Sequence, residues 1–332
     1  MSSEFDPKKF PVGIIGLGMM GSSIAVCMLI AGHPVTGVEL VEGALEDARL
    51  RINNHFKLAE EKGLLNGTTE DYLNKLHISS DLGSLKDCQL VIESIKEDIN
   101  IKGEVFKAVD KIVSKDAYIT SNTSAIPITD LQVFVSHPER FFGLHWMEPA
   151  FTTRFLEVIC GEKSDLDKAQ FLYGLGELWQ KETVLLKKDI PGFIANRLMY
   201  AMYREAMHLV DEDYASVEDV DRACRNVAGY FIPMMGVFRW MDFTGIASYR
   251  KVMKDLFPTL DNSDAPGKLI NKIVDEGGLG ITNGKGFYEY TEEEKEVWQK
   301  LYSDFSFEIR DLTLKYPADI VQQKLKEKKE EK

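Results

Sequence analysis

The sequence from Pro11 to Gly21 reads PVGIIGLGMMG, a short apolar run that leads directly into closely spaced glycines. An apolar run bounded by glycine predicts a buried strand, and the mostly apolar residues 22–31 that follow predict a helix. Gly16 permits the tight turn between strand and helix, Gly18 lets the backbone approach a bound group, and Gly21 lets the helix pack against the strand. The N–H groups and the positive dipole end of such a helix favour an anion. The stretch therefore predicts a dinucleotide-binding strand–turn–helix unit.

An acidic residue at the end of the next predicted strand indicates which dinucleotide binds. That strand covers residues 35–40 and carries Glu39. A carboxylate at this place accepts hydrogen bonds from ribose hydroxyls and repels a 2′-phosphate. We therefore predict NAD, in preference to NADP, on Glu39 and on the residues of the glycine turn. These are Gly16, Leu17, Gly18, Met19, Met20 and Gly21.

Predicted strands and helices alternate as far as residue 188. The charged segment 42–76, with a break at 63–69, and the segment 101–113 fit helices. Apolar runs that fit buried strands lie at 90–94, 117–121, 141–145, 155–159 and 183–186. This alternation is typical of a doubly wound α/β sheet with parallel strands and right-handed crossovers. We predict a Rossmann-type, NAD-binding α/β domain over 1–188.

The pattern changes after residue 188, where no strand-like alternation follows. Asp189 to Gly192, with proline at Pro191, is typical of a helix start. Apolar residues at helical spacing then predict a helix of roughly 20 residues. The segment 189–332 is predicted to be an all-helical substrate and dimerisation domain. It ends in a charged tail from about residue 291 to 332.

Composition and charge exclude several classes of partner. A hydrophobic content of 44% suits a packed core, and the formal net charge of −13 argues against nucleic acid, which needs clustered Lys and Arg. The longest apolar run, 24–31, is far shorter than the ~20 residues that span a bilayer, and no signal peptide is visible. The four cysteines form no CxxC pair, so no metal site is predicted. We expect a cytoplasmic protein without a membrane partner.

One histidine stands at a place where chemistry is expected. His145 ends an apolar predicted strand at the carboxyl edge of the sheet, where ligands collect in such folds. Its ordinary pKa of ~6.5 suits a proton acceptor. Glu157 lies in another apolar strand, where a carboxylate needs a partner. A Glu157–His145 pair would fix the imidazole tautomer and stabilise the imidazolium. Spacing alone leaves this pairing as one interpretation and separate packing roles as the other.

Several motifs, in order along the chain, together resemble the L-3-hydroxyacyl-CoA dehydrogenase family. The wider group includes 3-hydroxybutyryl-CoA dehydrogenases, lambda-crystallin/L-gulonate 3-dehydrogenase and carnitine dehydrogenase. The resemblance covers about residues 10–290. The motifs are Ser121-Asn122-Thr123-Ser124, Gly143-Leu144-His145 with Pro149, Leu156-Glu157-Val158-Ile159, Pro191-Gly192-Phe193-Ile194-Ala195-Asn196-Arg197 and Gly284-Lys285-Gly286-Phe287-Tyr288.

The resemblance implies an oxidoreductase that acts on CH–OH groups with NAD. It implies oxidation of an L-3-hydroxyacyl-CoA to a 3-ketoacyl-CoA, or the reverse, as in fatty acid metabolism, and a homodimer. His145 would be the base, held by Glu157, with Ser124 and Asn196 near the substrate oxygen or the histidine. From the residues alone, Ser124 also fits a turn cap and Asn196 a helix cap. The cofactor contacts that it implies beyond the glycine turn are Glu97, Lys102 and Asn122.

Departures from the family pattern concern the substrate. Glu148 stands where the family usually has Asn, and Arg239 follows an altered motif in the helical domain. Lys57 and Lys62 are candidates for binding CoA phosphates, although acidic residues lie beside them. We expect Glu148 or Arg239 to help select the substrate. The alternatives are a 3-dehydrogenase of a free small hydroxy acid, such as L-gulonate or carnitine, and a non-catalytic NAD-binding structural protein.

Overall fold

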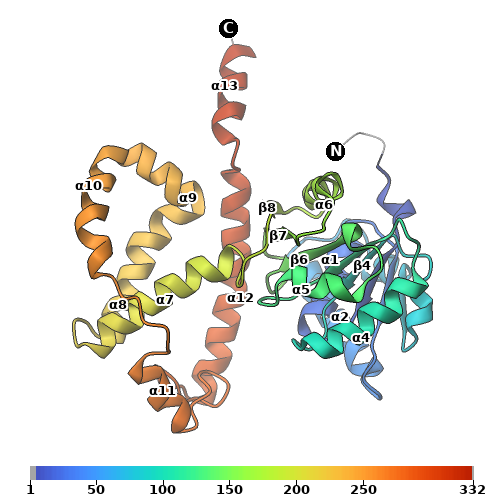
Figure 1. Cartoon of the computed structure of the whole chain (residues 1–332), viewed down its shortest axis with the longest axis horizontal. Coiled ribbons are helices and arrows are strands. Elements are labelled where there is room, and N and C mark those ends of the chain that lie inside the picture. The colour runs from blue at the N-terminus through green and yellow to red at the C-terminus, as the bar shows by residue number, and fades with distance from the viewer. Residues whose placement is uncertain (1–4, 331–332) are drawn as a thin grey trace. The chain divides into compact units, whose positions relative to one another are not determined.

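The computed structural model describes residues 5–330 of the chain. The chain divides into two compact units (Figure 1): one ends at Arg197 and is here called the sheet unit, and the other begins at Leu198 and is called the helical unit. Each unit is described by itself. No helix between residues 5 and 330 combines the length with the apolar composition that a membrane span needs.

The described part of the sheet unit contains one eight-stranded sheet, with the strand order β3–β2–β1–β4–β5–β6–β7–β8. The strands are β1 (Val12–Ile15), β2 (Val35–Val38), β3 (Leu76–Ser79), β4 (Leu90–Glu93), β5 (Tyr118–Ser121), β6 (Phe141–Trp146), β7 (Phe155–Cys160) and β8 (Glu182–Leu186). This confirms the predicted α/β class.

The prediction that the strands are parallel is wrong at one pair. β6 and β7 are antiparallel, whereas every other neighbouring pair is parallel. The chain returns from β6 to β7 through residues 147–154, which contain no helix. A parallel neighbour would need a crossover of a dozen or more residues, so a connection of this length reverses the strand. The β3 strand was also missed, because the helical prediction extended to residue 76.

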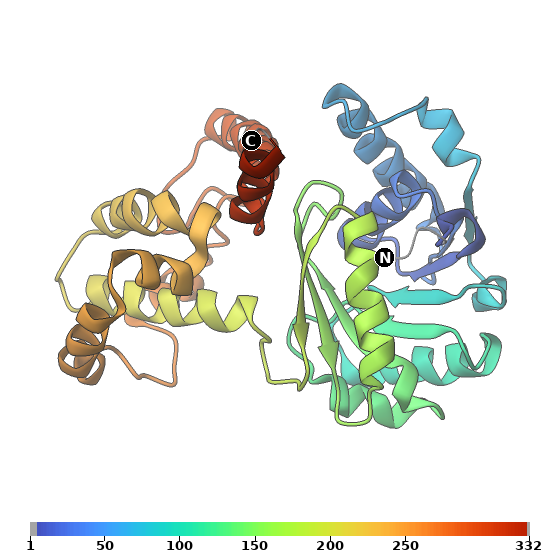
Figure 2. The ribbon, with the colours of Figure 1, turned by 90° about the horizontal axis from the view of Figure 1, so that it is seen from above.

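Helices cover both faces of the sheet (Figure 2). They are α1 (Met19–Ile30), α2 (Leu45–Glu61), α3 (Thr69–Leu73), α4 (Ile99–Ile112), α5 (Ile128–Leu131) and α6 (Leu166–Leu178). Trp179, which ends α6, packs on Trp146 of β6 and on His33 just after α1, so α1 and α6 share a face. Phe106 of α4 packs edge-on against Phe141, whose side chain points to the opposite face from Trp146. The sheet is therefore wound on both sides, as predicted.

The helical unit contains no strand among its described residues, as predicted. Its helices are α7 (Ala195–Asp211, which begins in the sheet unit), α8 (Val217–Ala223), α9 (Gly229–Thr244), α10 (Ile246–Leu256), α11 (Lys268–Asp275), α12 (Glu292–Lys315) and α13 (Ile320–Glu330). The predicted helix start at Asp189–Gly192 is wrong. Gly192 and Phe193 have φ of 78° and 52°, in the left-handed region, so the helix begins only after them.

Candidate active site

The glycine turn after β1 has the shape that a bound pyrophosphate needs. Gly16 has a φ of 84°, and a Cβ on Gly21 would lie 1.8 Å from the Gly16 carbonyl oxygen, so both positions require glycine. A Cβ on Gly18 would meet no atom within 4 Å. This is the open space that a ligand would occupy above the turn. Gly18 is also the N-cap of α1 and offers no side-chain cap, which leaves first-turn N–H groups for an anion.

Glu39 follows β2 directly, beside the glycine turn. Its side chain is buried, and its carboxylate accepts hydrogen bonds from the N–H of Leu17 (2.9 Å) and of Val41 (3.1 Å). The strand pairing of β1 with β2 brings this carboxylate to the turn. The backbone thus orients the acid at the place where an adenosine ribose would lie, and the residues present fit NAD.

His145 and Glu157 form a buried pair. They lie directly opposite each other in the antiparallel register of β6 and β7, and His145 Nδ1 is 2.6 Å from Glu157 Oε2. Both side chains are almost inaccessible to solvent. Because Nδ1 is used in this bond, Nε2 is the nitrogen left for a substrate proton. The Phe193 ring packs 5.7 Å from the imidazole, centroid to centroid.

The second carboxylate oxygen of Glu157 caps the start of α7. Oε1 accepts hydrogen bonds from the N–H of Ile194 (2.9 Å) and of Ala195 (3.1 Å). These are N–H groups that a helix cannot satisfy internally. Both oxygens of the buried acid therefore have donors, which a buried charge requires.

Asn196 and Ser124 are joined to each other. The Asn196 side-chain nitrogen donates to the Ser124 carbonyl oxygen at 2.9 Å, so this side chain contacts the loop after β5. Ser124 itself is exposed in the loop after β5. The contact places the Ser124 loop next to the α7 residues that Glu157 holds.

Glu97 also bonds to the loop that contains Ser124. Its Oε1 accepts from the Thr123 hydroxyl (2.5 Å) and from the Ser124 N–H (3.1 Å), and its Oε2 is 3.2 Å from Lys102 Nζ. Burial opposes ionisation of Glu97, but the hydrogen bond from Thr123 and the nearby ammonium outweigh it and hold the pKa below its usual value. Glu97 is thus an ordered anion that fixes the loop.

Lys102, which the resemblance implies as a cofactor contact, is buried near the start of α4. Its Nζ is 2.6 Å from Glu93 Oε1, and both side chains are almost fully buried. The Ser121 hydroxyl donates to Glu93 Oε2 at 2.6 Å. Sequence reasoning missed Glu93. The feature that could have identified it is the one that identified Glu157, an acid inside an apolar strand.

Asn122 joins the ends of neighbouring strands. Its Oδ1 accepts from the Trp146 N–H at 2.9 Å, and its Nδ2 donates to the Ser94 hydroxyl at 3.2 Å. It therefore lies beside His145 at the carboxyl edge of the sheet. Together with the contacts above, this bond brings His145, Glu157, Ser124, Asn196, Glu97, Lys102 and Asn122 into one network.

Glu148 follows β6 and lies against α1. Burial raises its pKa to about 7, and a hydrogen bond with Ser23 of α1 opposes that rise. Its Oε2 is buried without a hydrogen-bond partner among the described residues. An acid with this pKa is present in both its neutral and its ionised form near neutral pH.

The remaining substrate candidates are three cations. Lys57 is exposed on α2 and Lys62 ends that helix. Arg239 of α9 donates to the Ala318 carbonyl oxygen at 3.2 Å, within the helical unit. The roles predicted for these three cations stay predictions.

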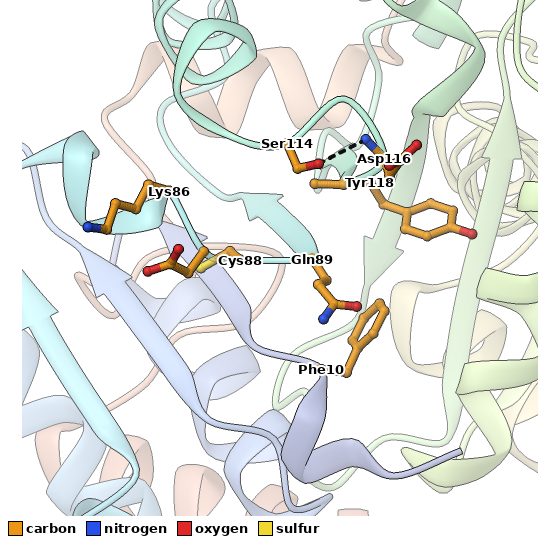
Figure 3. Close-up of a pocket in the computed structure, with 9 residues that line it drawn as sticks. Phe10, Lys86, Cys88, Gln89, Ser114, Asp116 and Tyr118 are labelled. Carbon is orange, nitrogen blue, oxygen red and sulfur yellow. Dashed lines mark hydrogen bonds between the residues drawn. The ribbon is translucent and has the colours of Figure 1, made fainter. Parts of the chain in front are cut away.

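A separate pocket lies at the opposite, amino-terminal edge of the sheet (Figure 3). It has a volume of about 390 Å³. Its lining comes from residues just before β1, β4 and β5, such as Phe10 and Gln89, and from Tyr118, which begins β5. None of the site residues described above lines it. We therefore place the chemistry at the carboxyl edge.

Comparisons with known proteins divide the chain near the boundary between the sheet unit and the helical unit. Residues 11–190 match the family model "3-hydroxyacyl-CoA dehydrogenase, NAD binding domain", and residues 192–290 match its "C-terminal domain". A 5-formyl-3-hydroxy-2-methylpyridine 4-carboxylate 5-dehydrogenase of Mesorhizobium japonicum is 32% identical, over 87% of this chain and 93% of that protein. A probable 3-hydroxybutyryl-CoA dehydrogenase of Deinococcus radiodurans is 34% identical, over 84% and 99%.

A solved structure gives the same result for the fold. The crystal structure of a 5-formyl-3-hydroxy-2-methylpyridine 4-carboxylic acid 5-dehydrogenase, described as an NAD⁺-dependent dismutase, aligns with a TM-score of 0.84 and 30% identity. The alignment covers 91% of this chain and 97% of that one.

Proposed function

The chain belongs to the 3-hydroxyacyl-CoA dehydrogenase family of NAD-dependent CH–OH oxidoreductases, and from that premise we propose that it oxidises an L-3-hydroxyacyl-CoA to the 3-ketoacyl-CoA, or catalyses the reverse. The observation that carries the proposal is the buried His145–Glu157 pair, with Nε2 left over for a substrate.

In this proposal His145 is the general base. Nε2 takes the proton of the substrate hydroxyl as the C–O bond becomes a carbonyl, and Glu157 stabilises the imidazolium through Nδ1. NAD, when bound, accepts the hydride that leaves the same carbon. Ser124 and Asn196 would position the substrate oxygen, because their loop and helix are tied to each other and to Glu157. The reverse reaction returns the proton from the imidazolium to the alkoxide.

The glycine turn and Glu39 are proposed to hold the cofactor. The first-turn N–H groups of α1 would bind the pyrophosphate, and Glu39 would accept from the ribose hydroxyls and exclude a 2′-phosphate. Glu97, Lys102 and Asn122 would order the loops that border the nicotinamide half. We further propose a homodimer.

A second candidate is a free small hydroxy acid. Its support is the similarity to a dehydrogenase that is named for a pyridine carboxylate, together with Glu148, which directly follows the strand that carries His145. In this case Glu148 or Arg239 would select the substrate. A non-catalytic NAD-binding role is the third candidate, and the complete pair at His145 and Glu157 argues against it.

One panel of assays separates the candidates. It compares NADH oxidation with acetoacetyl-CoA against NAD reduction with L-gulonate, L-carnitine and the pyridine carboxylate of the Mesorhizobium relative. Turnover of the thioester alone supports the acyl-CoA proposal, and turnover of a free acid supports the second candidate. No turnover of any of them, with NAD bound, supports the third. A His145→Gln variant should lose the turnover that is found and still bind NAD, and an unchanged rate would refute the proposed base.

A further inference from the structure

Arg51 of α2 places a cation against the glycine turn. Its side chain is half-buried, and its Nε donates to the Leu17 carbonyl oxygen at 3.0 Å. Leu17 is also the turn residue whose N–H donates to the Glu39 carboxylate. Two side chains of opposite charge, one after β2 and one on α2, therefore hold the N–H and the carbonyl group of the same turn residue.

The Arg51 guanidinium keeps donors for a ligand. Asp47 lies four residues earlier on α2, a spacing at which helical side chains can pair, yet neither it nor another acid between residues 5 and 330 forms an ion pair with Arg51. The neighbouring Arg49 differs, because its Nε is 3.8 Å from Glu46 Oε1. Within residues 5–330, the Leu17 carbonyl is the one hydrogen-bond partner of Arg51, and both Nη nitrogens stay unpaired.

His55, one helical turn further along α2, adds no second positive charge at neutral pH. Its Nε2 lies 3.2 Å from the Ser22 hydroxyl oxygen, and its ring packs 5.3 Å from that of Phe151, centroid to centroid. Burial lowers the pKa of His55, and the nearby Arg51 charge lowers it further. The imidazole is therefore neutral at pH 7, and the permanent charge at this place belongs to Arg51.

The turn itself supplies no charged side chain for a diphosphate. Residues 16–21 are glycine, leucine and methionine, and α1 contains no charged residue. The start of a helix offers only a partial positive charge, roughly +0.5, whereas the diphosphate of a dinucleotide is a dianion. The chain as a whole has a formal net charge of −13, which repels an anion. A cation beside the turn offsets both deficits.

We propose that Arg51 is a cofactor-binding residue that holds the diphosphate of NAD from the side of α2. The chain carries an NAD-binding domain, and the inference rests on the proposed placement of the diphosphate at the glycine turn. Nε anchors the guanidinium on the Leu17 carbonyl, and the Nη nitrogens donate to phosphate oxygens, which the planar guanidinium suits. Gly18 and Met19 are exposed, so an anion can reach the turn. Glu39 then binds the ribose and Arg51 the phosphates.

Two full-length variants test the proposal, Arg51→Gln and the matched control Arg49→Gln. Calorimetry and ligand-observed NMR measure the dissociation constants of NAD, ADP-ribose and adenosine. Arg51→Gln should raise those of NAD and ADP-ribose about ten-fold or more, because charge-assisted hydrogen bonds are lost, and leave that of adenosine unchanged. Added salt should weaken NAD binding less in this variant than in the wild type, since the screened charge is gone. Arg49→Gln removes an equal charge from the same helix and should change none of the three constants.

An Arg51→Gln protein that binds NAD as tightly as the wild type would overturn the inference alone, whereas a wild type that binds no NAD would refute the proposed cofactor site. Equal losses for adenosine and NAD would overturn it as well. Adenosine depends on Glu39 and so on Leu17, and such losses would mean that Arg51 only shapes the turn. A higher KM for the substrate with unchanged NAD binding would place the guanidinium on a substrate anion instead. Arg51→Lys keeps the charge and should recover part of the NAD affinity; it also serves if the glutamine variant does not fold.

Discussion

Replacing Glu157 by glutamine tests the proposed mechanism most directly. The Glu157 oxygen Oε1 accepts two N–H groups at the start of α7, and Oε2 faces His145 Nδ1. An amide has one oxygen, and the two α7 donors require it. The amide NH₂ group then faces Nδ1 and makes that nitrogen an acceptor, which leaves the ring proton on Nε2. The Glu157→Gln variant would hold His145 in the tautomer that cannot accept a substrate proton.

The size of the effect follows from the same geometry. In a Ser–His–Asp triad, a carboxylate-to-amide change that traps the wrong tautomer of the catalytic histidine costs about 10⁴ in kcat. The buried 2.6 Å contact here indicates a loss of about 10³–10⁴. Stability should fall by only about 1–3 kcal/mol, because one charge-assisted hydrogen bond is weakened and the α7 cap is kept.

The assay uses the substrate identified by the panel and measures kcat together with the NAD dissociation constant. Histidine ¹⁵N chemical shifts report the tautomer of His145 without any substrate. We expect a changed tautomer, a large loss of kcat and unchanged NAD binding. A Glu157→Gln enzyme that stays within about five-fold of the wild-type kcat would refute the reasoning, since tautomer trapping predicts a far larger loss.

Three further predictions concern the cofactor turn and the buried acid. Glu39→Gln should reduce the preference for NAD over NADP by about ten-fold, because a charged acceptor that repels a 2′-phosphate is lost. Titration with both cofactors measures the ratio of their dissociation constants. An unchanged ratio would argue against the role of Glu39 in cofactor selection. Gly18→Ala should keep the wild-type melting temperature yet weaken NAD binding, since its methyl group enters the open space above the turn. Gly21→Ala should also destabilise the fold by about 2 kcal/mol or more, since its methyl group meets a backbone oxygen. Equal melting temperatures for the two variants would contradict this difference. Glu148 has a folded pKa of about 7, above its unfolded value, so the folded state binds the proton more tightly and the wild type should lose stability as pH rises from about 4.5 to 7. Glu148→Gln should reduce the fall in melting temperature between pH 5 and pH 8, by the equivalent of roughly 1 kcal/mol after solvent screening, and an identical fall in both proteins would contradict the assignment.

The elements predicted well from sequence are those that local residue properties determine without distant contacts. The strand–turn–helix at Gly16–Gly21 needs glycines for local steric reasons, and the buried strands show as apolar runs. β3 was missed because this edge strand is half-exposed and directly follows the second part of a segment with a helical pattern. The antiparallel pairing of β6 and β7 was missed because an apolar run has no direction.

In the candidate site, too, some features could be predicted from local sequence and others depend on distant contacts. His145 and Glu157 could be proposed as a pair from polarity alone, but their contact depends on a strand reversal that the sequence did not indicate. The true start of α7 was missed because its cap is not local. Glu157, far away in the sequence, supplies the acceptor that a neighbouring Ser or Asp usually provides. Glu93 was passed over because its partner Lys102 lies on the next helix, and the sequence does not show that the two side chains meet.

The shared carboxylate of Glu157 makes the basicity of His145 depend on a helix position. α7 begins in the sheet unit, and most of its length belongs to the helical unit. A movement of α7 that withdraws the Ile194 and Ala195 donors would leave more negative charge for the imidazole and raise its proton affinity. By reciprocity, a proton on His145 changes the free energy of that movement by the same amount. Proton transfer and helix displacement are therefore thermodynamically linked through a single side chain.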